Sequence, residues 1–233
     1  MRWFGVVASV AVFAACSSDP GPALFPLAPG LSWTYRVSTT LENNTATRES
    51  LTLRTLARDT LDGQPTFRRR SDSGVDYWLR VDASGIYRVA SKSDVDVEPI
   101  RDPAPRYVLR MPIAVGTQWQ ASSTAYLLQK RQDFPREIRH AYPNVPMTYT
   151  IEATGESVAT PAGKFDACVR VRGQGVVHLY ADAVVGWRDM PLTTLEWYCP
   201  EVGLVRLERD EPARATYLIG GHLTMELLQW RKD

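Results

Sequence analysis

Short runs of alternating apolar and polar residues, separated by turn residues every 8–12 positions or so, most strongly constrain the fold of this chain. Trp33–Leu41, Ser50–Leu56 and Gly203–Glu208 are such runs, and they are rich in β-branched and aromatic residues. No stretch of a dozen residues keeps a helical period. The sequence therefore predicts an all-β protein whose antiparallel meanders form a curved sheet, an open barrel or a sandwich. Further strands are predicted at Tyr77–Val81, Met147–Glu152, Val169–Val171 and Leu223–Leu227, and turns at Asp62-Gly63, Ser73-Gly74, Ser84-Gly85, Pro161–Gly163, Gly173–Gly175 and Gly220-Gly221.

An internal repeat is the second feature. The segment Phe25–Trp33 (FPLAPGLSW) matches Met111–Trp119 (MPIAVGTQW) in its Pro, Ala, Gly and Trp positions, and two looser matches follow in the same order. We therefore expect one β domain over residues 24–233, built of two similar halves at about 24–105 and 106–233. Trp33 and Trp119 should then be buried at equivalent places, each near the start of a first strand.

The N-terminus has the pattern of an export signal. An apolar run from Trp3 to Ala15 follows Met1-Arg2, and it is shorter than the roughly 20 residues of a membrane-spanning helix. Cys16 follows two alanines, which resembles the lipobox of bacterial lipoproteins, although Phe13 stands where that pattern usually has leucine. The resemblance implies a signal peptide over 1–15, lipid attachment at Cys16 and a tether over 16–23. It implies a protein anchored in the bacterial envelope, at the outer membrane and facing the periplasm; an ordinary cleaved signal is the alternative.

Two further cysteines, Cys168 and Cys199, lie in segments that are predicted as strands. An even pair in an exported protein favours a disulfide because that compartment is oxidising. Closing a loop of this length would stabilise the fold by roughly 3–4 kcal/mol. Two buried free thiols are the alternative. A metal site is disfavoured because the chain has no Cys-x-x-Cys motif and no histidine close to either cysteine.

Three motifs resemble a broad set of uncharacterised bacterial envelope lipoproteins. They are FPLxxGxxWxY from Phe25 to Tyr35, TPAGxFxxCxxV from Thr160 to Val171 and WYxPxVGLV from Trp197 to Val205. The resemblance spans most of the chain after the N-terminal segment and implies an exported β protein. Its motifs are structural, so it implies no catalytic residue.

The charge of the chain argues against nucleic acid as a partner. Lys and Arg number 27 against 26 Asp and Glu, and the formal net charge is +1. Loss of Arg2 with the signal peptide would leave a neutral chain. The basic segments Arg68–Arg70 and Lys130–Arg139 could contact anionic lipid head groups. Solvated basic side chains are the simpler interpretation.

Groups that could carry catalysis or bind a metal are scattered. His140, His178 and His222 are predicted in a loop, a strand and a turn, without the spacing of a metal site. Asp94–Glu98 places three carboxylates at a period of two, which a calcium ion could use, although a solvated edge strand explains them more simply. We predict no catalytic residue, no metal and no cofactor.

These observations leave three hypotheses for function. The first is a lipid-anchored, periplasm-facing module that binds or supports other envelope components without catalysis. The second is a carrier or sensor of an apolar ligand on the concave face of the sheet, which requires an internal cavity of several hundred Å3. The third is a hydrolase with a dispersed site, for which the sequence offers no nucleophile. The tryptophans Trp33, Trp78, Trp119 and Trp197 could line such a cavity or pack the core, and the repeat favours the core.

Overall fold

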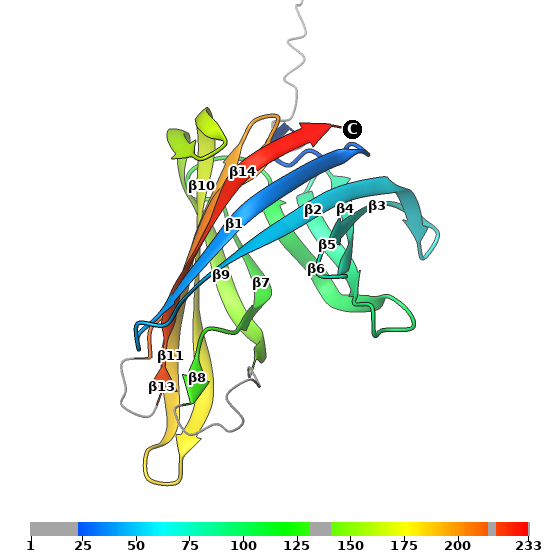
Figure 1. The fold of residues 1–233 in the computed structure, drawn as a ribbon. Helices are drawn as coiled ribbons and strands as arrows, with labels where there is room; N and C mark the ends of the chain where they lie inside the picture. Colours follow the sequence, from blue (N-terminus) through cyan, green and yellow to red (C-terminus); the bar gives the residue numbers. More distant parts are fainter. Residues whose placement is uncertain (1–22, 131–140, 214–217, 233) are drawn as a thin grey trace, which may run out of the picture.

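The computed structural model describes residues 23–130, 141–213 and 218–232, and most of them belong to one antiparallel sheet of 12 strands. The sheet curls into a nearly closed barrel, so the all-β prediction is confirmed (Figure 1). Two short strands, β8 (Gln129–Lys130) and β13 (Leu218–Ile219), pair separately. Within these ranges, helices with the length and hydropathy of a membrane span are absent. The main strands are β1 (Leu31–Leu41), β2 (Ala46–Leu61), β3 (Gln64–Ser71), β4 (Asp76–Asp82), β5 (Gly85–Lys92), β6 (Ile100–Arg110), β7 (Gln118–Ala125), β9 (Tyr142–Thr160), β10 (Gly163–Asp182), β11 (Gly186–Cys199), β12 (Gly203–Glu211) and β14 (Gly221–Lys232).

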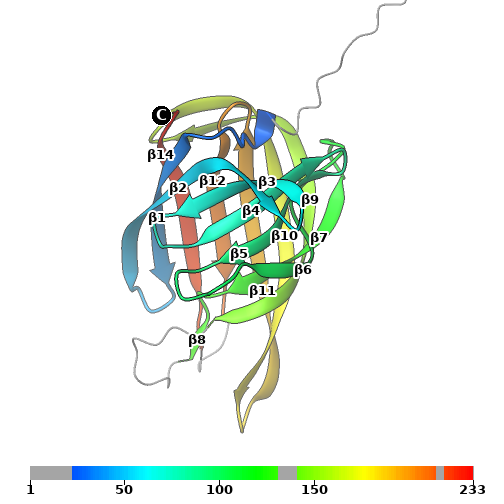
Figure 2. The same ribbon diagram turned by 90° about the vertical axis from the view of Figure 1, so that its right-hand side faces the viewer.

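The strand order divides the sheet into two meanders. Strands β1 to β6 are consecutive neighbours, and β7, β9, β10, β11, β12 and β14 form the second series. Strand β14 pairs with β1 and joins the two series, whereas β6 and β7 are the two ends of the sheet. Figure 2 shows β3 to β6 in front of β9 to β12, so the two halves face each other across the interior. Two copies of a six-stranded meander would give this order, and the duplication remains a proposal. The boundary expected at 105/106 falls inside β6, whereas the strand order would put the junction in the connection 111–117.

The two matched tryptophans occupy similar local settings. Gly30 and Gly116 precede the first strand of each series with φ of 82° and 91°, a backbone region that favours glycine. The N–H of Gly30 donates to the carbonyl of Thr55 at 3.0 Å, and that of Gly116 donates to the carbonyl of Ile151 at 2.9 Å. Three residues later, Trp33 and Trp119 are both buried, with indole N–H groups that donate to backbone carbonyls.

The inner face of the sheet carries the core, as the alternation of side chains in strands requires. Trp78 is buried in a separate small cluster with Leu61 and Ala90, and Arg68 lies over its ring. Trp197 is only half-buried: it packs against the cluster that contains Trp33, while its indole N–H donates to Glu156 at 2.9 Å. Arg206 lies over its ring. Its neighbour Tyr198 points inward, so the polar surroundings of Trp197 follow from strand alternation.

The predicted turn at Gly173–Gly175 is wrong, because both glycines lie inside β10. A Cβ atom on Gly173 would come within 2.4 Å of the hydroxyl of Thr194, and one on Gly175 within 2.4 Å of the sulfur of Met147. These glycines therefore admit side chains from the neighbouring strands. Glycine in a strand often marks such a close approach rather than a turn.

Candidate ligand-binding cavity

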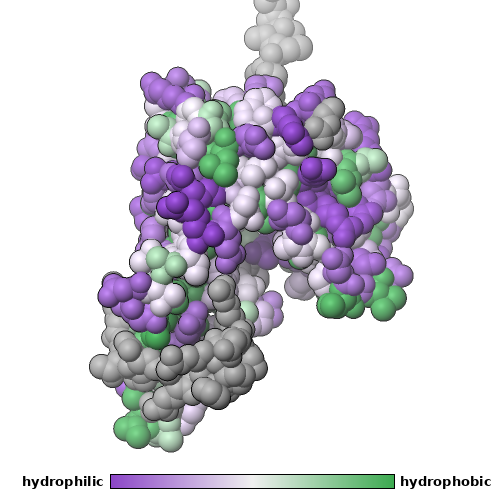
Figure 3. All heavy atoms as spheres, in the orientation of Figure 1, coloured by the Kyte–Doolittle hydropathy of each residue, from purple (hydrophilic) through white to green (hydrophobic). Residues whose placement is uncertain are grey.

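A cavity of about 770 Å3, open to solvent along the exposed residues Asn43–Ser50, lies against the inner face of the β1–β2 hairpin. Its opposite wall is the segment Tyr126–Gln129, which follows β7 and ends in the first residue of β8. In Figure 3, which has the orientation of Figure 1, the surface is hollowed below β2, between the part formed by β9 to β12 and the part formed by β3 to β6. The described lining residues are Val37, Thr39, Leu41, Asn43, Thr45, Thr47, Glu49, Ser50, Leu51, Asp72, Ser73, Tyr126, Leu127, Gln129 and Leu223.

The lining combines apolar side chains with hydroxyl groups. Leu51, Leu127 and Leu223 supply apolar surface from three separate segments, and threonines and serines supply hydroxyl groups between them. The charged side chains among the described lining residues are Glu49 and Asp72, and both are acidic. This combination suits a molecule with an apolar part and a neutral or cationic polar part. An anionic head group would meet two like charges.

A buried carboxylate on β12 fixes one wall of the cavity. Glu211 has no exposed surface, and its carboxylate accepts backbone hydrogen bonds from Tyr126 at 3.1 Å, Leu127 at 2.8 Å and Leu128 at 3.2 Å. Arg209 donates to the same carboxylate at 2.6 Å. Because buried N–H groups need partners, Glu211 holds the segment that forms the wall.

Arg209 extends this contact to β7. Its guanidinium donates to the carbonyl of Thr124 at 2.5 Å and to the hydroxyl of Ser123 at 3.4 Å, and it lies over the ring of Tyr126. Strand β12 therefore binds both the end of β7 and the segment that follows it through the Arg209–Glu211 pair.

A second buried polar cluster consists of Glu196 and Tyr198 on β11 and Tyr149 on β9. Glu196 accepts hydrogen bonds from the hydroxyls of Tyr198 and Thr194. Burial raises the pKa of Glu196, while these hydrogen bonds and the charges of Arg209 and Arg106 act in the opposite direction. Burial also raises the pKa of Tyr149 to about 12. The interior of the sheet therefore contains polar side chains as well as the apolar core clusters.

Arg69 corrects the interpretation of Arg68–Arg70 as solvated or lipid-contacting residues. These arginines lie in β3, and Arg69 is 7% exposed. Its guanidinium lies 4.3 Å from the ring centres of both Phe25 and Trp33 and donates to the carbonyl of Pro26 at 2.9 Å. Burial lowers the pKa of Arg69 to about 10. It attaches the segment before β1 to the inner face of the sheet.

The predicted basic segment Lys130–Arg139 and the predicted acidic segment Asp94–Glu98 do not form binding sites among the described residues. Most of Lys130–Arg139 lies outside the described residues. Asp94–Glu98 forms the turn between β5 and β6 and not a strand. Asp94 pairs with Arg70 at 2.7 Å, and Asp96 accepts hydrogen bonds from Ser93, so the carboxylates do not share one face.

The histidines that the structure describes pair with single carboxylates. His140 lies outside the described residues. His178 lies on β10 as predicted and contacts Asp189 at 2.6 Å. His222 lies in β14 and not in a turn, and it contacts Asp210 at 2.8 Å. Within the described ranges, no three His, Cys, Asp or Glu side chains are grouped so that they could hold a metal ion.

The predicted cysteine pair lies on neighbouring strands. The sulfur atoms of Cys168 and Cys199 are 1.99 Å apart in a disulfide, and their Cα atoms are 4.1 Å apart, just below the expected range. Both residues are buried. Formation of this bond in the native protein remains a prediction, tested below. Cys16, the predicted lipid attachment site, lies outside the described residues.

Sequence reasoning missed Arg69, Arg209 and Glu211. One signal was present: Arg209 and Glu211 continue the alternation of β12 on the face of Leu207, so charged residues occupy apolar positions. The partners that make this tolerable come from β7 and from the segment after it, which are distant in sequence.

Comparison with known proteins assigns no function. No family model and no curated protein matches the chain. A candidate lipoprotein from Parabacteroides distasonis is similar over 89% of this chain and 98% of its own, with 16% identity and a TM-score of 0.44. A candidate exported protein with a YmcC-like fold from Bacteroides fragilis has the same coverage and identity and a TM-score of 0.39. Neither likeness identifies a ligand or partner.

Proposed function

We propose that this chain is a non-enzymatic binding module of the bacterial envelope, which takes a small amphipathic molecule into the cavity between β1–β2 and Tyr126–Gln129. A lipid on Cys16 would hold it at the outer membrane, facing the periplasm. The export-type N-terminus supports the location, and the cavity supports the binding role.

The observation that carries the binding role is the size and position of the cavity. Its volume of about 770 Å3 falls within the range of roughly 300–1,000 Å3 that is typical of small-molecule sites. It lies on the concave face, where the hypothesis of a carrier or sensor requires it.

The chemistry of the lining narrows the ligand. Burial of an alkyl or aryl group against Leu51, Leu127 and Leu223 would supply most of the affinity, at about 25 cal/mol per Å2 of apolar surface. Hydroxyl groups would orient the polar part. Because Glu49 and Asp72 are the charged groups in the described lining, a neutral or cationic amphiphile is favoured over a fatty acid or another anion.

Two neighbouring substitutions on β1 test this proposal. Thr39 lines the cavity, whereas Thr40 is exposed and points to the opposite face. The variant Thr39→Trp should fill the cavity, and Thr40→Trp is the matched control. The probe is 1-N-phenylnaphthylamine, an uncharged aromatic amine whose fluorescence rises in apolar surroundings.

We expect saturable 1:1 binding of the probe to the wild type and to Thr40→Trp, and binding weaker by at least about tenfold, or 1.4 kcal/mol, in Thr39→Trp. Circular dichroism would verify that both variants are folded. Equal affinity in the two variants, or no saturable binding to the wild type, would contradict the proposal.

A further inference from the structure

The two ends of the sheet, β6 and β7, leave a second pocket between them. Although β6 and β7 are consecutive in the chain, they are not hydrogen-bonded as sheet neighbours. Pro103 and Pro105 on β6 have no N–H group to offer to β7. A pocket of about 240 Å3 lies at this seam, and residues of β9 complete its wall.

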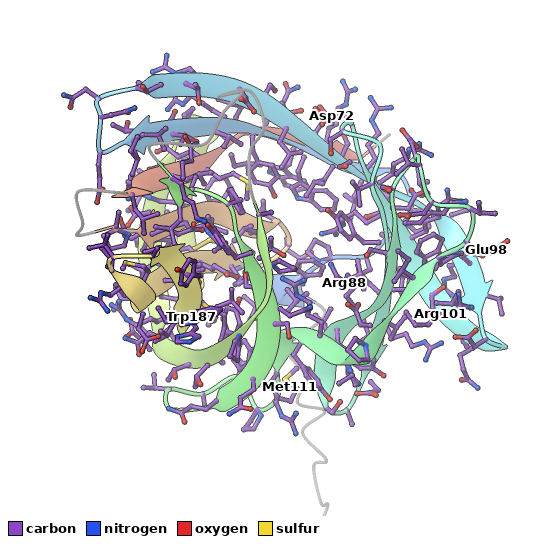
Figure 4. The ribbon with its side chains drawn as sticks, turned by 90° about the horizontal axis from the view of Figure 1, so that it is seen from below. Asp72, Arg88, Glu98, Arg101, Met111 and Trp187 are labelled. Atoms are coloured by element: carbon purple, nitrogen blue, oxygen red, sulfur yellow. A yellow bond between two sulfur atoms is a disulfide. The ribbon has the colours of Figure 1, made fainter. Side chains whose placement is uncertain are left out.

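An arginine without a counter-ion lies in this pocket. Arg88 binds Asp102 through two hydrogen bonds of 2.7 and 2.5 Å, so these two charges neutralise each other. Arg88 lies on the inner side of the sheet in Figure 4. Arg106 lies opposite Arg88 in the β5–β6 pairing. Among the residues that the structure describes, no carboxylate lies within ion-pair distance of Arg106. Arg106 therefore has no direct ion-pair partner among the described residues, although Asp102 and Glu196 lie within electrostatic range of it.

Other groups that line the pocket can donate hydrogen bonds. Ser122, Ser123 and Thr124 on β7 line the pocket. Strand alternation places Ser123, which is buried and accepts from Arg209, on the opposite face from Ser122 and Thr124. Gln120 and Asn144 supply side-chain amides. Strand β7 is also an edge of the sheet, so its backbone N–H groups on that side have no strand partner. A half-buried guanidinium with several neutral donors around it is the usual composition of an oxyanion site.

We propose that the β6–β7 pocket binds a single oxyanion group, a carboxylate or a phosphate, through Arg106 and the unpaired backbone N–H groups of the β7 edge. The volume is sufficient for such a group and a small substituent. The site is distinct from the cavity beside β1–β2, whose described charged lining is acidic, and the proposal does not rest on that cavity.

The electrostatics around Arg106 agree with this assignment. Burial and the nearby charge of Arg88 lower the pKa of Arg106, while Asp102 and the hydroxyls of Tyr149 and Tyr77 act in the opposite direction. Glu196 is also within electrostatic range of Arg106, without an ion pair between them. A bound oxyanion would supply the direct ion pair that Arg106 lacks.

The test uses inorganic phosphate and succinate as probes, in calorimetric titrations of the whole chain at fixed ionic strength. Arg106→Gln removes the free charge. Arg101→Gln is the matched control, because Arg101 lies on the same strand but is exposed and pairs with Asp62. We expect saturable binding of at least one probe to the wild type and to Arg101→Gln, and at least about tenfold weaker binding to Arg106→Gln, which corresponds to 1.4 kcal/mol.

A second measurement keeps the proposal testable if Arg106→Gln fails to fold. Phenylglyoxal modifies accessible guanidinium groups, and mass spectrometry of peptides locates the modified arginines in the wild type. Phosphate or succinate should slow modification at Arg106 but not at Arg101. Equal binding by both variants, or no protection of Arg106 together with no saturable binding of either probe or of anionic vesicles, would overturn the proposal.

Vesicles distinguish a lipid head group from a free oxyanion. Binding to vesicles that contain phosphatidylglycerol, lost in Arg106→Gln, would assign the site to a lipid phosphate; binding of the soluble probes alone would assign it to a free molecule. Binding of 1-N-phenylnaphthylamine should be the same in Arg106→Gln as in the wild type. The two proposals can therefore fail separately.

Discussion

Replacing Glu211 by glutamine should destabilise the protein far more than its exposed counterpart on the same strand. Glu211 and Arg209 are spaced by two residues on β12, and their side chains are 0% and 7% exposed. Glu208 and Arg206 have the same spacing on the outer face, with side chains 25% and 34% exposed. Glu208→Gln is therefore a control that is matched in strand, spacing and chemistry.

The magnitudes follow from burial. Glu211→Gln leaves Arg209 buried without its counter-ion and weakens the acceptor for three backbone N–H groups, and breaking such a pair costs about 3–5 kcal/mol. Removing a partly exposed pair costs roughly 0–1 kcal/mol. Urea unfolding followed by tryptophan fluorescence would measure both values. In thermal unfolding, Glu211→Gln should lower Tm by roughly 6–20 °C.

A result in which Glu211→Gln costs no more than Glu208→Gln would refute the reasoning. The double variant Arg209→Met/Glu211→Gln gives a further check. It should be less destabilised than the sum of the single variants, because the second substitution removes the unpaired charge. Additive losses would mean that the two side chains do not act as a pair.

Three further predictions concern the core, the cysteines and pH. Trp33→Ala and Trp119→Ala should each cost about 3–5 kcal/mol in urea unfolding, because both side chains are buried; losses below about 1 kcal/mol would show that they do not pack the core. Thiol counting in denatured, non-reduced protein from the periplasm should find no free thiol at Cys168 or Cys199, and two would refute the disulfide. The pKa of Glu196 is raised in the folded state, so its contribution to stability is full below its ordinary pKa of 4.5 and is lost as the pH rises through the folded value. Glu196→Gln should therefore reduce the fall in stability above pH 4.5. An unchanged pH profile would contradict this.

The sequence was sufficient for features that depend on neighbouring residues. Alternation in Trp33–Leu41 and the turn at Asp62-Gly63 reflect local geometry, and both are where the pattern placed them. The turn predicted at Gly173 is wrong because the sequence alone does not distinguish a glycine in a turn from a strand glycine that makes room for a neighbouring side chain. Only the packing of Tyr149 and Thr194 from adjacent strands distinguishes the two cases.

The candidate sites depend on contacts that no local pattern contains. Arg69 looks like part of a basic surface segment until Phe25 and Trp33 are brought to either side of it. The lack of an ion pair at Arg106 likewise depends on the pairing of Arg88 with Asp102, which engages a carboxylate of the same pocket. Burial and counter-ion supply are properties of the folded sheet, so sequence reasoning could not have found either site.

The central claim, that the concave face binds an amphipathic ligand, is tested most directly by methyl NMR during titration with 1-N-phenylnaphthylamine. The cavity should produce saturable shifts at the methyl groups of Leu51, Leu127 and Leu223, which line it, and none at Leu228, which is 36% exposed. The shifts should disappear in Thr39→Trp and persist in Thr40→Trp. Shifts confined to exposed leucines, or no shift at Leu127 and Leu223 under saturating probe, would contradict the claim.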